Sequence, residues 1–160
     1  MYSERQIKLW FKKIRNDSYS DLCLSSKVHI ELMGFTGYSS PFTGDVYINL
    51  DKINNSNYTK DGMVGLIAHE LAHQVSYRKR SFIGKWIFLW NYYFSLKKRC
   101  EVEKEADEIT IQRGYGKELI SEITSEYEYY SDDREMLKFI KKVYSTPNDI
   151  KRLIRKYSKK

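Results

Sequence analysis

Apolar residues recur along most of this chain at intervals of three and four, which is the spacing of one face of a helix. Alternating runs at Val28–Met33 and Asp45–Leu50 predict two strands, joined by a loop rich in Gly, Ser and Thr that contains Pro41. We therefore expect an α+β fold, mostly helical, with a small sheet of about three strands. The predicted helices cover residues 3–16, 60–78, 82–96 and 98–113, the last ending at Gly114, with two or three more toward the C-terminus.

The predicted helix over residues 60–78 is apolar at most positions except at His69-Glu70-Leu71-Ala72-His73. Residues four apart lie on the same helix face, so both imidazoles can reach one metal ion while Glu70 lies beside them. Polar groups buried without partners are costly, and a metal supplies partners. The HExxH spacing predicts zinc-assisted hydrolysis, with Glu70 as general base on a zinc-bound water. The alternative is a buried histidine pair that faces a neighbouring helix, with Glu70 in solvent.

Two histidines do not complete a zinc site, and a third histidine six residues past the motif is excluded because Lys79 stands there. A second helix offers a carboxylate instead. Glu103 and Asp107 are four apart and share a face, and the small Ala106 permits close approach of the two helices. Glu103 can be the third ligand, and Asp107 can accept a hydrogen bond from the far nitrogen of a ligating histidine. We expect one Zn²⁺ per chain.

HExxH followed by Glu103-Lys104-Glu105-Ala106-Asp107 resembles the gluzincin metallopeptidases. The likeness is to the CAAX prenyl protease and heat-shock membrane protease family, and in size to its small relatives, the minigluzincins. It implies a zincin-like active-site helix and a glutamate helix. It also implies that His69, His73 and Glu103 bind zinc, with Glu70 as base and Asp107 supporting a histidine. The length of the chain predicts a single domain over residues 1–160.

The resemblance further implies that the strand before the active-site helix forms the rim of the cleft and binds an extended peptide by strand addition. Here that strand holds Val46, Tyr47, Ile48 and Asn49. The segment Thr146-Pro147, with Arg152 five residues after the proline, resembles a family segment that has His-Pro. This makes Arg152 a candidate substrate contact. Donors for the oxyanion include Tyr92, Tyr115 and Arg152, whereas we interpret His29 as structural.

Latency is a second implication of the resemblance, because the small family members are associated with self-inhibited forms. The basic tail, residues 155–160, is the segment that we expect to occupy the cleft, in the same chain or in a neighbouring subunit of a homo-oligomer. The chain opens on an amphipathic helix rather than a secretory signal. Its two cysteines, Cys23 and Cys100, are far apart, so we expect no disulfide framework and a cytoplasmic protein.

The net charge of +7 is unevenly distributed. Residues 118–137 hold seven acidic side chains against one basic, and residues 138–160 hold nine basic side chains against one acidic. Such a basic block attracts nucleic acid or an anionic membrane. No recognition motif with interleaved aromatic residues accompanies it, so we do not expect a nucleic-acid partner; a solvated helix face that pairs with the acidic stretch explains the block.

The apolar segment at residues 82–96 is too short to span a bilayer, which takes about 20 residues. We expect it to pack into the core and the cleft wall; the alternatives are contact with a membrane interface through its Trp and Tyr side chains, or an oligomer contact. The leading hypothesis is a zinc endopeptidase that hydrolyses extended or unfolded polypeptides. The alternatives are a catalytically silent zinc-site binding module, a protease peripheral at the cytoplasmic membrane face, and a basic surface-binding protein with an incidental HExxH.

Overall fold

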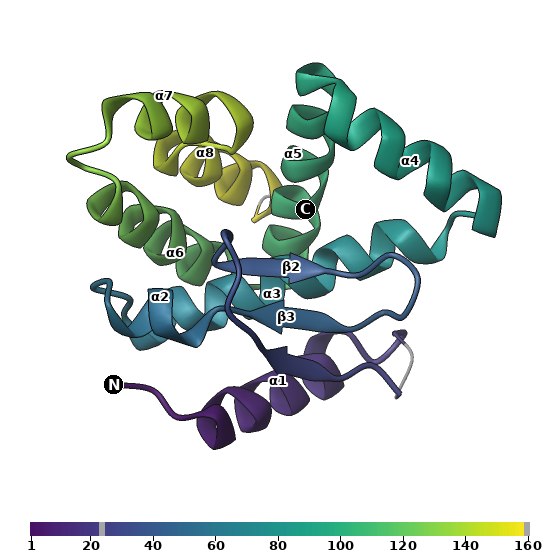
Figure 1. The fold of residues 1–160 in the computed structure, drawn as a ribbon, viewed down its shortest axis with the longest axis horizontal. Coiled ribbons are helices and arrows are strands. Elements are labelled where there is room, and N and C mark those ends of the chain that lie inside the picture. Colours follow the sequence, from purple (N-terminus) through teal and green to yellow (C-terminus); the bar gives the residue numbers. More distant parts are fainter. Residues whose placement is uncertain (23–24, 159–160) are drawn as a thin grey trace.

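The computed structural model describes residues 1–22 and 25–158, so predictions about Cys23 and the last two lysines of the tail fall outside the described residues. It confirms a mostly helical α+β fold with a small sheet (Figure 1). The strands are β1 (Val28–Ile30), β2 (Gly37–Ser39) and β3 (Val46–Ile48). The helices are α1 (Glu4–Ser18), α2 (Leu50–Asn54), α3 (Lys60–Arg78), α4 (Phe82–Phe94), α5 (Leu96–Gln112), α6 (Gly116–Tyr129), α7 (Arg134–Val143) and α8 (Pro147–Tyr157).

The sheet has the order β1-β3-β2, with β1 parallel and β2 antiparallel to β3. The strand that the sequence predicted at Asp45–Leu50 is therefore the central one and is paired along both edges. The third strand, β2, lies within the segment predicted as a loop. Its residues, Gly37-Tyr38-Ser39, lack the alternating apolar side chains that identify a strand in sequence. Within the sheet, β2 is an edge strand, as β1 is on the other side.

Helix α3 forms the centre of the core. Its first turn is capped by Thr59, whose side-chain oxygen accepts a hydrogen bond from the Gly62 amide. Apolar side chains from α1 and the sheet cover one side of α3 and make a continuous cluster with it (Figure 1). On another side, Gly65 lets α3 approach α6 closely, since a Cβ there would lie 2.3 Å from the Glu118 carbonyl oxygen. This crowding holds the middle of α3 in a fixed position.

Helix α4 is much less buried than the sequence predicted. It begins and ends close to the predicted bounds, but Phe88 is its one buried residue, and most of its aromatic side chains face solvent. The expectation that residues 82–96 pack into the core was therefore wrong for the larger part of the helix. Apolar side chains cover both an inner face and an outer face of the helix. Only the inner face packs against the rest of the chain. No helix in the described part of the chain has the length and apolar character needed to cross a membrane.

The C-terminal helices close the other end of the molecule. Helices α6 and α8 share an apolar cluster with the end of α5. Pro147 occupies the first turn of α8, and Thr146 and Asp149 form a capping box there. The short connection between α7 and α8 is drawn toward α5, because the Ser145 amide donates a hydrogen bond of 3.2 Å to the Asp107 carboxylate.

Candidate metal centre

Two helices present the candidate ligands, and their spacing follows from helix geometry. His69 and His73 are one turn apart on α3, so their rings lie on the same face with centroids 4.7 Å apart. Glu103 and Asp107 are likewise one turn apart on α5. Ala106 is buried between them and allows α5 to approach α3. The two faces meet in the interior, and all four residues are at least 94% buried.

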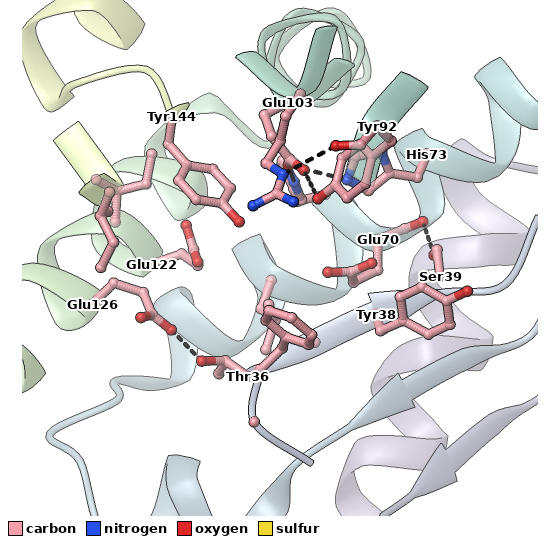
Figure 2. A pocket seen from close by; sticks show the side chains of 18 of the residues that line it. Thr36, Tyr38, Ser39, Glu70, His73, Tyr92, Glu103, Glu122, Glu126 and Tyr144 are labelled. Carbon is pink, nitrogen blue, oxygen red and sulfur yellow. Dashed lines mark hydrogen bonds and ion pairs between the residues drawn. The ribbon is translucent and has the colours of Figure 1, made fainter. Parts of the chain in front are cut away.

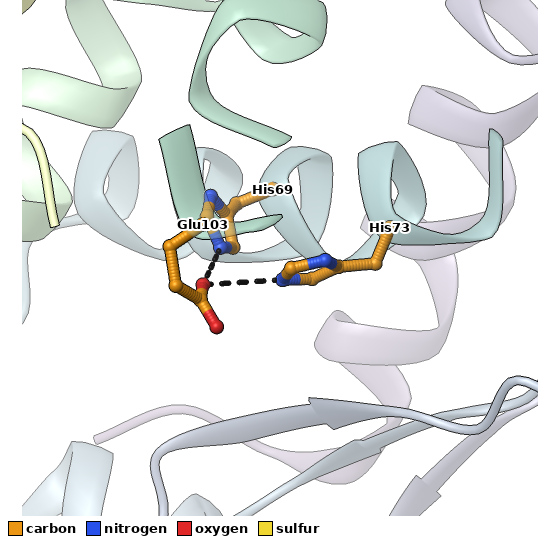
Figure 3. A group of neighbouring side chains, drawn as sticks. All are labelled: His69, His73 and Glu103. Carbon is orange, nitrogen blue, oxygen red and sulfur yellow. Dashed lines mark hydrogen bonds and ion pairs between the residues drawn. The ribbon is translucent and has the colours of Figure 1, made fainter. Parts of the chain in front are cut away.

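The side chains of His69, His73 and Glu103 converge on one point (Figure 3). Glu103 Oε2 lies 3.2 Å from Nε2 of His69 and 3.3 Å from Nε2 of His73. One ligand atom from each residue lies within 4.8 Å of the other two. Two imidazole nitrogens and a carboxylate oxygen are ligands that zinc accepts, and the three are buried together. The group therefore fits a metal ion and can hold one.

Two further side chains hold these ligands in place. Asp107 Oδ1 lies 3.1 Å from Nδ1 of His69, which leaves Nε2 of that ring directed at Glu103. Tyr92, on the inner face of α4, donates a hydrogen bond of 2.5 Å from its hydroxyl to Oε1 of Glu103. Such contacts orient a ligand and set the tautomer of a histidine. The sequence predicted the role of Asp107 but proposed Tyr92 as an oxyanion donor rather than as a partner of Glu103.

The electrostatics of the group favour an ionised Glu103 and a protonated His69. Burial alone would raise the pKa of Glu103, but His73 and His69 hold that pKa well below its usual range. Burial opposes protonation of His69, and the hydrogen bonds to Asp107 and Glu103 outweigh it, so the pKa of His69 is raised. Positive charge at this point is thus stabilised by the carboxylates of α5. A bound cation satisfies the same carboxylates.

Glu70 lies beside the ligands and faces the pocket (Figure 2). The Ser39 hydroxyl donates a hydrogen bond of 2.5 Å to the Glu70 carbonyl oxygen and so ties β2 to α3. Gly37 passes directly over the Glu70 side chain, because a Cβ at that position would lie 2.7 Å from Oε1. Oε2 of Glu70 is buried without a hydrogen-bond partner among the described residues. Burial raises the pKa of Glu70, although His73 and His69 oppose the rise.

The pocket around this group is formed by β2, α3, the inner face of α4, α6 and the start of the α7–α8 connection (Figure 2). One wall is apolar and aromatic, from Phe88, Leu89 and Tyr93 of α4. The opposite wall carries Glu122 and Glu126 of α6. Tyr144 joins the pocket from the α7–α8 connection, with its hydroxyl directed inward and its ring centroid 6.3 Å from that of His69. The sequence did not single out Tyr144, although it stands two residues before the Thr146-Pro147 segment.

Several predicted substrate contacts lie elsewhere. Val46 and Ile48 are buried in the core, and Tyr47 is paired with a neighbour on each side, so β3 does not line the pocket. Its place is taken by β2, because β2 is the edge strand next to α3. Arg152 is largely exposed and pairs with Asp149 one turn earlier on α8, outside the pocket.

Three other predicted residues are also away from the pocket. Tyr115 stacks on Tyr19 at a centroid distance of 6.4 Å and does not line the pocket. His29 stacks on Tyr47 and lies 3.4 Å from Asp45, which agrees with a structural role. Tyr157, in the basic tail, donates a hydrogen bond to Glu108 of α5, and no described tail residue lines the pocket.

Comparison of the chain with known protein families, with curated proteins and with solved structures finds no match. The functional argument therefore rests on the residues of the site and on their arrangement.

Proposed function

We propose that this chain is a zinc-dependent endopeptidase that hydrolyses extended or unfolded polypeptides. The observation that carries the proposal is the convergence of His69, His73 and Glu103 beside the buried carboxylate of Glu70, in a pocket open to one edge of the sheet. The motifs that resemble the gluzincin metallopeptidases support the same reading.

The ligand set favours zinc over the common hard cations. Two imidazoles and one carboxylate are typical of catalytic zinc sites, which keep one coordination position open, whereas Ca²⁺ and Mg²⁺ prefer oxygen ligands. When bound, zinc supplies a Lewis acid that polarises the scissile carbonyl and makes water nucleophilic near neutral pH. His69, His73 and Glu103 would hold the ion, with Asp107 and Tyr92 orienting His69 and Glu103.

Glu70 is the candidate general base. Its free Oε2 faces the same space as the ligands, and a carboxylate there can take the proton of the attacking water and pass it to the leaving amine. Burial raises the pKa of Glu70, which makes its carboxylate a stronger base than an exposed one. Gly37 passes close over the Glu70 side chain and the Ser39 hydroxyl holds the Glu70 carbonyl, so a shift of β2 would displace Glu70.

Strand β2 offers a docking edge for the substrate. The Thr36 carbonyl and the Ser40 amide bond to β3, so by the alternation of an antiparallel pair the main-chain groups of Gly37 and Ser39 point toward the free edge. An extended peptide can add to this edge as a further strand. A folded protein does not present such a strand readily, which is why we propose extended or unfolded polypeptides as substrates.

Turnover of an unfolded protein tests the proposal. Wild type and Glu70→Gln are loaded with zinc, and hydrolysis of casein is measured beside the metal content of each. Wild type should be active, and Glu70→Gln should bind zinc equally and lose about 10²-fold or more in rate, since general-base catalysis contributes about 10²–10⁴-fold. Glu105→Gln, on an exposed face of α5, is the matched control and should keep full activity.

The second candidate function is a zinc-bearing binding module that cleaves nothing. Stoichiometric zinc with no hydrolysis in either protein would favour it and overturn the peptidase. Equal hydrolysis by wild type and Glu70→Gln would also contradict the proposed role of Glu70.

A further inference from the structure

The outer face of α4 is an apolar surface that the rest of the described chain leaves uncovered. Its side chains are each more than half exposed, and they carry no polar group other than the indole N–H of two tryptophans. At helical spacing they form one continuous strip along the helix. Soluble proteins rarely expose apolar area of this extent without a partner. We call this surface the α4 ridge; it consists of Phe82, Ile83, Trp86, Ile87, Trp90 and Phe94.

A loop residue extends the ridge onto the sheet. Phe42, between β2 and β3, has its ring 4.9 Å from Trp86 and 5.6 Å from Phe82, centroid to centroid. Phe42 is itself exposed. The apolar cluster therefore joins two segments distant in sequence, and α4 itself lies at the edge of the molecule (Figure 1).

The charged side chains in the segment that carries the ridge have one sign, and Glu101, just beyond it, pairs with Lys98. Between residues 71 and 100 there is no Asp or Glu, and there are seven Lys and Arg side chains. They lie mostly at the two ends of α4, with Arg78 and Lys79 before the helix and Lys97 and Lys98 after it. An apolar strip with tryptophans, bordered by basic side chains, is complementary to an anionic lipid surface, where acyl chains meet phosphate headgroups.

A second copy of the chain fits the ridge poorly. A two-fold contact of ridge against ridge would bring fourteen basic side chains together with no acidic residue of the same segment to pair with them. We propose that the α4 ridge docks on the surface of an anionic bilayer, with α4 lying in the plane of the interface. The inner face of α4 contributes Phe88, Leu89 and Tyr92 to the pocket, so docking would hold the pocket next to the bilayer. The inference stands apart from the proposed peptidase activity, because docking needs neither metal nor turnover.

Vesicle binding tests it with the full chain. Two of the three tryptophans, Trp86 and Trp90, are on the ridge, so a Trp10→Phe background makes fluorescence report on the ridge alone. Binding of every variant is measured by co-sedimentation with vesicles of phosphatidylcholine, with and without phosphatidylglycerol, and fluorescence is added for the proteins that keep Trp86 and Trp90. We expect binding to the mixed vesicles that salt weakens, and a blue-shifted emission that brominated lipids quench.

Two variant pairs separate the apolar and charged contributions. Trp86→Asp with Trp90→Asp should reduce binding about tenfold or more, since both rings would lose their place in the interface. Leu9→Asp with Leu32→Asp, which alters exposed apolar residues elsewhere, is the control and should not. Lys79→Gln with Lys97→Gln should weaken binding about fivefold for each charge, at about 1 kcal/mol per basic residue near the surface. Lys12→Gln with Lys151→Gln should have little effect.

Three outcomes would overturn the inference. The first is absence of binding to phosphatidylglycerol vesicles by a correctly folded wild type. The second is equal binding by the Trp86→Asp/Trp90→Asp protein, which would place the contact in the basic C-terminal block. The third is a dimer in sedimentation that this variant abolishes while vesicles remain unbound, which would make a second copy the occupant.

Discussion

Tyr144 lies in the pocket beside His69, with its hydroxyl directed into the pocket (Figure 2). Burial, reinforced by the nearby Glu103 carboxylate, raises the pKa of Tyr144 well above its ordinary value, so the phenol keeps its proton as a donor. We expect it to stabilise the oxyanion of the tetrahedral species. Its neighbour Ser145 is held by Asp107, which fixes the connection that carries Tyr144.

Replacing Tyr144 with phenylalanine removes that donor and little else. Tyr144→Phe should lower kcat about 10²-fold, with KM and zinc content nearly unchanged, because loss of one oxyanion donor costs about 10²–10³ in kcat. Steady-state hydrolysis of a peptide substrate measures the two constants separately. Tyr115→Phe is the control, since Tyr115 is outside the pocket. An unchanged kcat in Tyr144→Phe would remove Tyr144 from the mechanism.

Glu122 is a second pocket residue whose environment changes its chemistry. Burial, and then the neighbouring carboxylate of Glu126, raises the pKa of Glu122 well above its ordinary value of 4.5. The folded chain therefore keeps this proton at pH values where the unfolded chain has released it. The contribution of Glu122 to stability is fully present below pH 4.5. It is then lost as the pH rises through the folded-state pKa of this residue.

Glu122→Gln removes this loss, because glutamine does not ionise. Its free energy of unfolding should exceed that of wild type at neutral pH, and the difference should shrink toward zero as the solution is made acidic. Urea unfolding across that range measures it, with Glu128→Gln on the exposed side of α6 as control. A difference that does not vary with pH would show that Glu122 is not the titrating group.

At the scale of elements, the contact of α3 with α6 fixes the helix that carries both histidines. Gly65→Ala would place a Cβ 2.3 Å from the Glu118 carbonyl oxygen, so one helix must move. We expect a net destabilisation of about 1–3 kcal/mol, the usual cost of overpacking. This prediction holds despite the roughly 1 kcal/mol by which Ala favours a helix over Gly. Chemical denaturation measures the change, and Gly34→Ala, which meets no atom within 4 Å, is the control. Equal stability of both variants would show that the two helices separate freely.

The elements that local pattern specifies were predicted well. Side chains close together in sequence specify the capped, apolar α3 and the helix that ends near Gly114. The same local spacing predicted the grouping of His69, His73, Glu103 and Asp107. Strand β2 was missed because it owes its conformation to pairing with β3 and contact with α3, which are tertiary effects. Helix α4 has close to its predicted bounds and forms part of the pocket wall, but its packing into the core was wrongly predicted for a related reason. Periodicity shows that a helix is apolar but not which neighbour covers it.

At the scale of the whole molecule, the candidate metal joins α3 to α5 through side chains that the unfolded chain does not hold together. Zinc should therefore bind the folded state selectively and stabilise it by about 2.7 kcal/mol at a hundredfold excess over Kd. Urea unfolding with zinc and with a chelator measures this difference. We expect it in wild type and in Glu70→Gln, which keeps all three ligands.

The chain's three histidines supply matched variants for this measurement. His73→Gln removes a ligand, so its unfolding free energy should respond little to zinc or to the chelator. His29→Gln alters a histidine that stacks on Tyr47 outside the pocket, so it should keep the full response. If His73→Gln responded as strongly as wild type, zinc would be binding elsewhere in the chain. The convergence of α3 and α5 would then be a hydrogen-bonded contact that needs no metal.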